Sequence, residues 1–209
     1  MAATYKVKQG DHVSRIAKQF GFADYRTIWD HPNNAKLKTL RQNPNVLAPG
    51  DDLFIPDKQL KTEARPTGAS HRFKAPVQPL LLRVVFKTFD DQPVANTPCK
   101  LQLEGQTFQL TTDAAGKIEK EIPKNAEGGK LTIGDQEFPV KVGHLDPVDL
   151  VSGFRARLNN LGYNAGESED PDDPQLRSAI EEFQCDQHLG IDGICGTQTQ
   201  KKLKESHGC

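Results

Sequence analysis

Apolar residues near the start of the chain recur first at every second position and then at helical spacing. Tyr5 and Val7 alternate with lysines, which predicts a short, half-buried strand. The sequence Gln9-Gly10-Asp11 predicts a turn after this strand. Asp11 is placed to cap the helix that follows. The apolar face of that helix consists of Val13, Ile16, Ala17 and Phe20. Gly21 is expected to end it in a left-handed conformation.

A second helix is expected from about Asp24, with Tyr25, Ile28 and Trp29 on one face. A second short apolar strand is expected at residues 53–55, where Pro56 stops it. The first 57 residues therefore predict the order strand, helix, helix, strand. Residues 58–78 have little periodicity and several breakers, which predicts an extended linker.

Period-2 alternation dominates from residue 79 to residue 143. Residues 80–89 are rich in Leu, Val and Phe and predict a strand. Residues 100–104 and 107–111 alternate around Gly105-Gln106, which predicts a hairpin. Short alternating strands separated by Gly, Pro and Asp turns indicate a small antiparallel β-sandwich.

Helical spacing returns in residues 144–209. One helix is expected from about residue 150 to 161, capped by Asp149 and ended by Gly162. A second is expected from Pro174, and a third is expected after a cap at Thr197. A tight loop over residues 189–196 separates the last two. The fold class is thus α+β with several domains, ending in a three-helix bundle.

Composition and charge exclude several function classes. The chain has 209 residues, 26% of them charged, and a net charge of −1, so we expect neither a nucleic-acid partner nor an anionic membrane partner. No apolar run approaches the roughly 20 residues that span a bilayer. The first ten residues lack the apolar core of a signal peptide, so we expect synthesis in the cytoplasm without Sec export.

The first 57 residues resemble a LysM domain. The similarity is carried by Tyr5-x-Val7-x-x-Gly10-Asp11, Ile16-Ala17, Asn45 and Pro49-Gly50-Asp51-x-Leu53-x-Ile55-Pro56. The resemblance implies a βααβ fold that binds glycans containing N-acetylglucosamine. The glycan groove of the family maps onto two loops, formed by Gly10, Asp11, His12 and Val13 and by Asn43, Pro44, Asn45, Val46 and Leu47. The chain departs from the family at His12-Val13, where Thr-Leu is common, and in its longer segment 31–41.

Residues 147–209 resemble the peptidoglycan-binding domain 1 family. The motif comprises Leu158-x-x-Leu161-Gly162-Tyr163, Ala179-Ile180-x-x-Phe183-Gln184 and Gly190-Ile191-Asp192-Gly193-Ile194-x-Gly196-x-x-Thr199-x-x-x-Leu203. The resemblance implies a three-helix, non-catalytic wall-binding module. Asp192, Gly193 and Gly196 are its candidate glycan residues, and a role for Asp192 in holding the loop together is the alternative.

The middle segment resembles the Ig-like or carboxypeptidase-regulatory-like spacers of bacterial proteins, on its Phe-Asp-Asp-Gln-Pro-Val-Ala and Thr-Asp-Ala-Ala-Gly turns. It shows no catalytic constellation, and a scaffold role is expected. The carboxylates of residues 167–173 form a charge run in a loop, which favours solvation over a glycosidase pair.

Cysteines and histidines offer no metal or cofactor site. The four cysteines match no zinc spacing, and no His-x-x-x-His helix is present. Two alternatives stay open for Cys195 and Cys209, namely reduced thiols and a disulfide between them. We therefore expect no metal and no cofactor.

Three functions follow from these patterns. The first is a non-enzymatic protein that tethers itself or a partner to peptidoglycan at the bacterial envelope, with two weak modules reinforcing each other. The second is an adaptor or cargo component of a type VI or contractile injection system that binds a spike or effector protein. The order of the modules resembles proteins of that group, and injection would explain envelope action without Sec export. The third is a wall hydrolase, for which the modules leave no separate catalytic domain.

Overall fold

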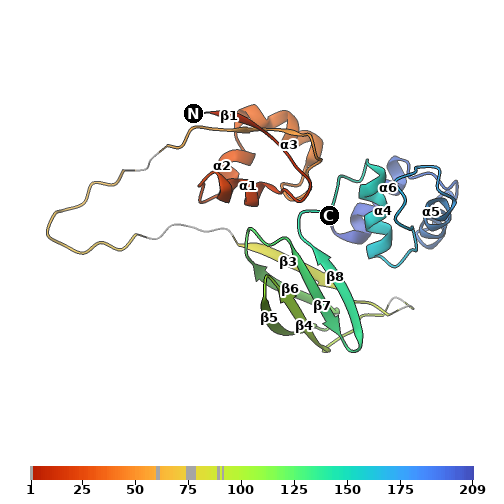
Figure 1. Ribbon diagram of the computed structural model, residues 1–209. Coiled ribbons are helices and arrows are strands. Elements are labelled where there is room, and N and C mark those ends of the chain that lie inside the picture. Colours follow the sequence, from red (N-terminus) through yellow and green to blue (C-terminus); the bar gives the residue numbers. More distant parts are fainter. Residues whose placement is uncertain (1, 60–61, 74–78, 89, 91) are drawn as a thin grey trace.

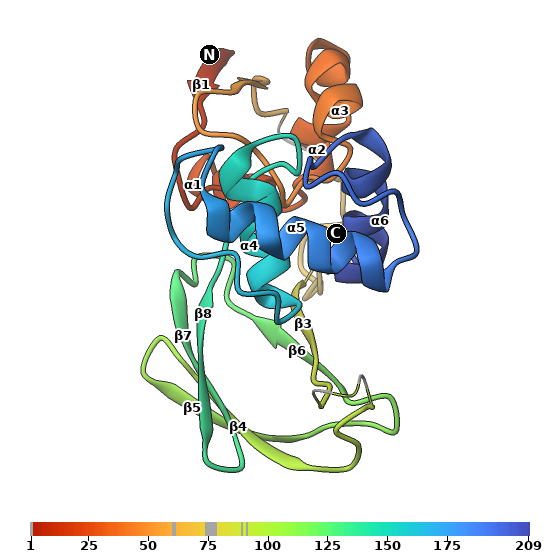
Figure 2. The same ribbon diagram turned by 90° about the vertical axis from the view of Figure 1, so that its right-hand side faces the viewer.

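The computed structural model describes residues 2–59, 62–73, 79–88, 90 and 92–209. Within these residues the fold is mixed α/β, with six α-helices and small antiparallel sheets. Buried apolar side chains form three separate clusters along the chain. We name the surrounding regions the first module (residues 2–57), the β-module (residues 79–143) and the third module (residues 144–209). Figures 1 and 2 show both helical modules at the same end of the β-module.

The first and last elements of the first module are strands that pair with each other. Strand β1 (Ala3–Lys6) pairs antiparallel with β2 (Asp52–Ile55). Between them lie α1 (Val13–Gln19), α2 (Arg26–Trp29), the 3-10 turn η1 (Pro32–Asn34) and α3 (Ala35–Arg41). The expected second helix is therefore a single turn, and a third helix occupies much of the segment that lengthens this module.

Asn34 ties the helical part of the first module to its sheet. Its side-chain amide donates to the carbonyls of Ile28 and Phe54, and its oxygen accepts from the Phe54 N–H. The side chain is buried, so each of these bonds replaces a bond to water that burial removes. A single buried amide thus fixes β2 against the end of α2.

The cap expected for the first helix was wrong. His12 is the N-cap residue of α1, and its Nδ1 accepts from the Arg15 N–H at 3.3 Å. Asp11 instead accepts from the Tyr5 hydroxyl at 2.8 Å and from the Lys8 N–H at 2.9 Å. The carboxylate is used to close the turn after β1, so the next residue caps the helix.

The β-module has two sheets around one core. Strand β3 (Leu80–Val85) pairs with β6 (Lys117–Ile122). The second sheet has the order β5-β4-β7-β8, made from β4 (Pro98–Leu103), β5 (Gln106–Thr111), β7 (Gly128–Ile133) and β8 (Gln136–Lys141). The first strand is shorter than the expected 80–89, and residue 89 lies outside the described residues. Buried residues of both sheets, including Leu80, Leu101 and Leu131, share the core.

The hairpin expected from residues 100–104 and 107–111 is present, but its turn lies one residue earlier than the expected Gly105-Gln106. Strands β4 and β5 pair from Pro98 opposite Thr111 to Leu103 opposite Gln106. Glu104 and Gly105 make the connection, and both have positive φ (49° and 75°). Such two-residue turns match the right-handed twist of the strands that they join.

Three helices build the third module: α4 (Val151–Asn160), α5 (Pro174–Asp186) and α6 (Thr197–His207). Pro174 begins α5 as expected, with Asp173 as its cap. The caps expected for the other two were wrong, because α4 starts after Leu150 and α6 after Gly196, without a side-chain cap. Asp149 lies 3.7 Å from the Arg41 guanidinium of the first module instead.

The expected linker is described in part. Residues 62–73 form no helix or strand, and their side chains are exposed. Residues 60–61 and 74–78 lie outside the described residues. No helix among the described residues is long and apolar enough to cross a membrane.

Candidate functional site

The loop between α5 and α6 is organised by one buried amide, that of Gln184. Its nitrogen is directed at the Asp192 carboxylate (2.8 Å), the Ile194 carbonyl (3.0 Å) and the Thr199 hydroxyl (3.0 Å). Its oxygen accepts from the backbone N–H groups of Asp192 and Gly193, both at 3.0 Å. Only 1% of Gln184 is exposed, so the loop is folded around it.

Asp192 holds this loop from the outside. Its Oδ1 accepts from Gln184 and from the Ile194 N–H at 2.9 Å. The hydrogen bond from Gln184, followed by that from Ile194, lowers the pKa of the Asp192 carboxyl. Gly193 has a φ of +69°, and a Cβ there would lie 2.7 Å from a Glu181 carboxylate oxygen. Asp192 and Gly193 thus have the structural role that the sequence offered for Asp192, and Gly196 is the exposed N-cap of α6.

The same loop presents two apolar side chains to solvent. Ile191 is 60% exposed and Ile194 is 65% exposed. They stand on either side of the Asp192-Gly193 turn, whose conformation Gln184 fixes. A rigid loop that exposes apolar groups has the properties of a contact surface, because little ordering entropy remains to be lost on binding.

The acidic run of residues 167–173 is held by a buried guanidinium. Arg155 pairs with Asp173 at 3.0 Å and donates to the carbonyls of Ala165 and Asp170. The bond from the Gln175 N–H, and then the bond from Arg155, lower the pKa of the Asp173 carboxyl. Among the described residues no group of three or more His, Cys, Asp or Glu is placed to hold a metal ion.

Arg157 anchors both ends of the third module. Its side chain is 1% exposed, and it donates to the carbonyls of Asp146, Gly153 and Cys209 at 2.7–2.9 Å. Cys195 and Cys209 are free thiols, so the structure holds the reduced alternative and not the disulfide. Burial raises the pKa of the Cys195 thiol to about 12, which keeps it protonated at neutral pH.

The first module brings together the two loops expected to form its groove. The Val13 N–H donates to the Pro44 carbonyl at 2.9 Å, which joins residues 10–13 to residues 43–47. Of these residues, Asn45 is exposed, and Asn43 and Pro44 are half-buried. The buried members are Gly10, Asp11, His12, Val13, Val46 and Leu47.

Residues 143–146 cover the first of these loops. A Cβ added to Gly143 would lie 2.4 Å from the Gly10 carbonyl oxygen and 3.3 Å from the His12 ring. A Cβ added to Gly10 would lie 3.2 Å from Nε2 of His144. Only glycines allow this approach, so residues 10–12 are packed against the chain itself and not open to solvent.

Further polar contacts join the first module to its neighbours. Arg15 pairs with Glu127 at 2.6 Å, and Arg41 lies between Asp51 and Asp149. The Gln9 amide donates to Asp146 at 3.5 Å. We call the region of these contacts the seam. No local sequence pattern points to the seam, because the partners that it joins across modules lie more than 100 residues apart.

We expect that Gly143→Ala opens the seam. The added Cβ meets the Gly10 carbonyl, and φ at Gly143 is +76°, which alanine tolerates poorly. We expect the clash to destabilise the seam by at least about 1.4 kcal/mol. Amide hydrogen exchange in residues 10–16 should therefore accelerate by about tenfold or more, because about 1.4 kcal/mol corresponds to a factor of ten. Gly134→Ala is the matched control, because Gly134 also has positive φ (+55°) but no neighbour within 4 Å. Equal acceleration of residues 10–16 in both variants would contradict this expectation.

Residues 148–203 match the family model described as "Putative peptidoglycan binding domain". This segment contains the whole of α4 and α5, the Gln184 loop and most of α6. The matched segment therefore lies within the third module, on which Ile191 and Ile194 are exposed. None of the curated proteins matches the chain.

One solved structure is similar to part of the chain. It is a periplasmic domain of the EpsAB fusion protein of the Vibrio vulnificus type II secretion system. The identity is 18% and the TM-score is 0.24, over 65% of this chain and 68% of that chain.

Proposed function

We propose that the protein binds bacterial peptidoglycan without cleaving it, and tethers itself or a partner to the wall. The observation that carries this proposal is the family match over residues 148–203. The glycan expected to be recognised is the polymer containing N-acetylglucosamine, and the site of action is the cell envelope.

We place the main contact on the exposed end of the Gln184 loop. Ile191 and Ile194 offer aliphatic surface that suits the C–H faces of pyranose rings and the methyl groups of N-acetyl substituents. Asp192 and Gly193 lie between them, and their backbone is already fixed by Gln184. Binding therefore costs little ordering of the loop, which supports weak but specific attachment.

In this proposal the first module contributes less to glycan binding than its resemblance to LysM implies. Residues 10–13 are buried in the seam, while the exposed edge near Asn45 stays accessible. A second weak contact at that edge would add avidity, because both modules belong to one chain.

The second candidate function is that of an adaptor in a type VI or contractile injection system. The exposed apolar pair Ile191 and Ile194 favours it, because such a pair suits a protein partner as well as a glycan. Co-purification with a spike or effector protein, sensitive to the same two side chains, would support this role.

The decisive experiment is a pull-down with purified peptidoglycan sacculi. We expect the variant I191S/I194S to bind about 5- to 150-fold more weakly, since two exposed apolar contacts are worth roughly 1–3 kcal/mol together. Leu40→Ser is the matched control, because Leu40 is an apolar residue of the first module that is 62% exposed. Absence of sacculus binding by the unaltered protein would refute the proposed function, and unchanged binding by I191S/I194S would refute the assignment of the contact surface.

A further inference from the structure

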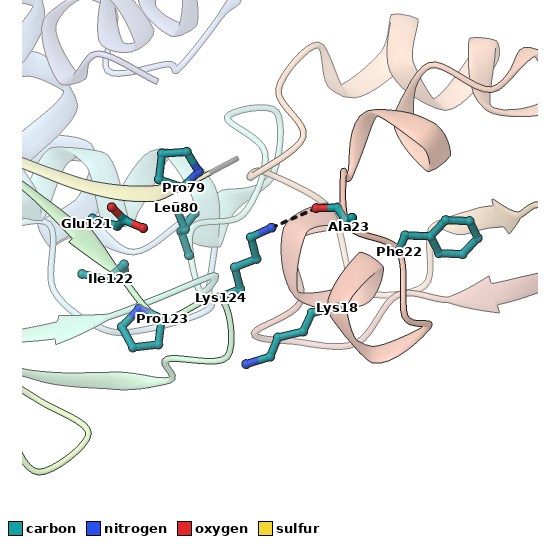
Figure 3. Close-up of a pocket in the computed structure, with 9 residues that line it drawn as sticks. All are labelled: Lys18, Phe22, Ala23, Pro79, Leu80, Glu121, Ile122, Pro123 and Lys124. Carbon is teal, nitrogen blue, oxygen red and sulfur yellow. Dashed lines mark hydrogen bonds between the residues drawn. The ribbon is translucent and has the colours of Figure 1, made fainter. Parts of the chain in front are cut away.

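Two crevices meet along the end of β6. The first, of about 330 Å³, lies between the first module and the β-module and is lined by Lys18 and Ala23 on one side and by Leu80, Ile122 and Lys124 on the other (Figure 3). The second, of about 410 Å³, lies between β5 and β6. Both are lined by Glu121, Ile122 and Pro123, so the two crevices adjoin, and we call the pair the joined crevice.

Two lysines reach across the first crevice in opposite directions. Lys18 of the first module donates to the Asn125 side chain of the β-module at 2.5 Å. Lys124 of the β-module reaches the Ala23 carbonyl of the first module at 3.4 Å, as Figure 3 shows. Within the described part of the chain, neither ammonium group pairs with a carboxylate. Both positive charges are therefore held at the crevice without a direct ion-pair partner, although the Glu121 carboxylate also lines it.

The second crevice adds to this positive charge. Lys120 lies over the Phe108 ring, 4.4 Å from its centroid, at the edge between β5 and β6. The joined crevice thus has three lysines and one carboxylate, Glu121, among its lining residues. Cationic side chains along a cleft with low-dielectric walls concentrate anionic ligands.

The floor of the joined crevice is apolar. Leu80 and Ile122 are buried members of the β-module core, and Pro79 and Pro123 lie beside them. A ligand that fits must therefore carry carboxylates for the lysines and small apolar groups for this floor. The volume of each crevice, about 330 and 410 Å³, is at the lower end of the range for ligand pockets, which favours a short peptide.

We propose that the joined crevice binds a short acidic peptide with small apolar side chains, namely the stem peptide of peptidoglycan. The choice of this peptide rests on the proposed function, since a glycan-bound protein meets it at high local concentration. The peptide carboxylates pair with Lys18 and Lys124, and its methyl groups rest on Leu80 and Ile122. A ligand held in this way bridges the first module and the β-module.

The test is titration of the full chain with the synthetic tripeptide L-Ala-γ-D-Glu-diaminopimelate, followed by NMR or calorimetry at low salt. We expect binding, and we expect Lys18→Gln and Lys124→Gln each to weaken it by about tenfold, as the loss of one charge-assisted contact implies. Lys201→Gln is the matched control, because Lys201 is an exposed lysine on α6 of the third module. A tripeptide with amidated carboxyl groups should bind the unaltered protein as weakly as the acidic tripeptide binds the double variant Lys18→Gln/Lys124→Gln.

Two results would overturn the crevice proposal. One is the absence of tripeptide binding by the unaltered chain, and the other is a Lys201→Gln control that weakens binding as much as the two crevice variants do. Either result would leave the proposed function standing if sacculi are still bound. The variant I191S/I194S separates the two sites further, because it should lose sacculus binding and keep tripeptide binding.

Discussion

Replacing Gln184 by leucine should lower the free energy of unfolding of the third module by about 3 kcal/mol. The leucine fills a similar volume but leaves the Asp192 carboxylate, the Thr199 hydroxyl and the loop N–H groups without their partner. These groups lie in a loop whose centre is buried, so water replaces the amide poorly. The expected decrease in the free energy of unfolding is larger than the contribution of a single hydrogen bond, because five contacts depend on the Gln184 side chain.

Hydrogen exchange resolves this effect module by module. A change of about 3 kcal/mol accelerates exchange in α4, α5 and α6 by about a hundredfold, since about 1.4 kcal/mol corresponds to a factor of ten. Exchange in β2 and in the β-module should not change. Gln198→Leu is the control, because Gln198 is an exposed residue of α6. If Gln184→Leu left the exchange of α5 unchanged, the buried amide would not be the organiser of the loop.

The second large effect is a loss of stability of the first module in acid. His12 is 1% exposed, and its Nε2 has no hydrogen-bond partner. Burial first, and then the Arg15 charge, lower the pKa of His12 from 6.5 to about 4. The His12 imidazole is therefore protonated below pH 6.5 in the unfolded chain, but only below about pH 4 in the folded chain. Stability is fully present above pH 6.5 and falls as the pH drops toward 4, by about 3 kcal/mol for this shift.

Trp29 reports this transition, because it is the only tryptophan and lies in the core of the first module. Urea unfolding followed by its fluorescence should give a midpoint that falls between pH 6.5 and 4. In His12→Asn that dependence should be weaker, since asparagine keeps a capping acceptor for the Arg15 N–H but does not titrate. His31→Asn is the control, because His31 also caps a turn through Nδ1 and is partly exposed. Equal pH dependence in the unaltered protein and His12→Asn would rule out His12 as the cause.

Local periodicity predicted the elements with the most regular patterns. The β4–β5 hairpin and the start of α5 at Pro174 follow from alternation and from proline at a favoured helix position. Helix caps were less predictable, because an acidic residue near a helix start competes for several donors. Asp11 is used by Tyr5 and Lys8, so His12 became the cap.

The geometry of the candidate sites was less accessible from sequence. The motif over residues 190–199 pointed to the loop of the third module, but it did not show that Gln184 holds the loop or that two isoleucines are exposed. The seam depends on contacts between residues far apart in the chain, such as Gly10 with Gly143. No local pattern encodes such a contact, since glycine at both positions is equally compatible with an ordinary turn.

Arg157 has a practical consequence for isolating the third module as a fragment. The family match covers residues 148–203. Two of the three carbonyls that accept from Arg157 lie outside this range, because they belong to Asp146 and Cys209. A fragment trimmed to the matched residues would retain a buried guanidinium and lose most of its acceptors. A transplantable unit therefore has to extend at least from residue 146 to residue 209.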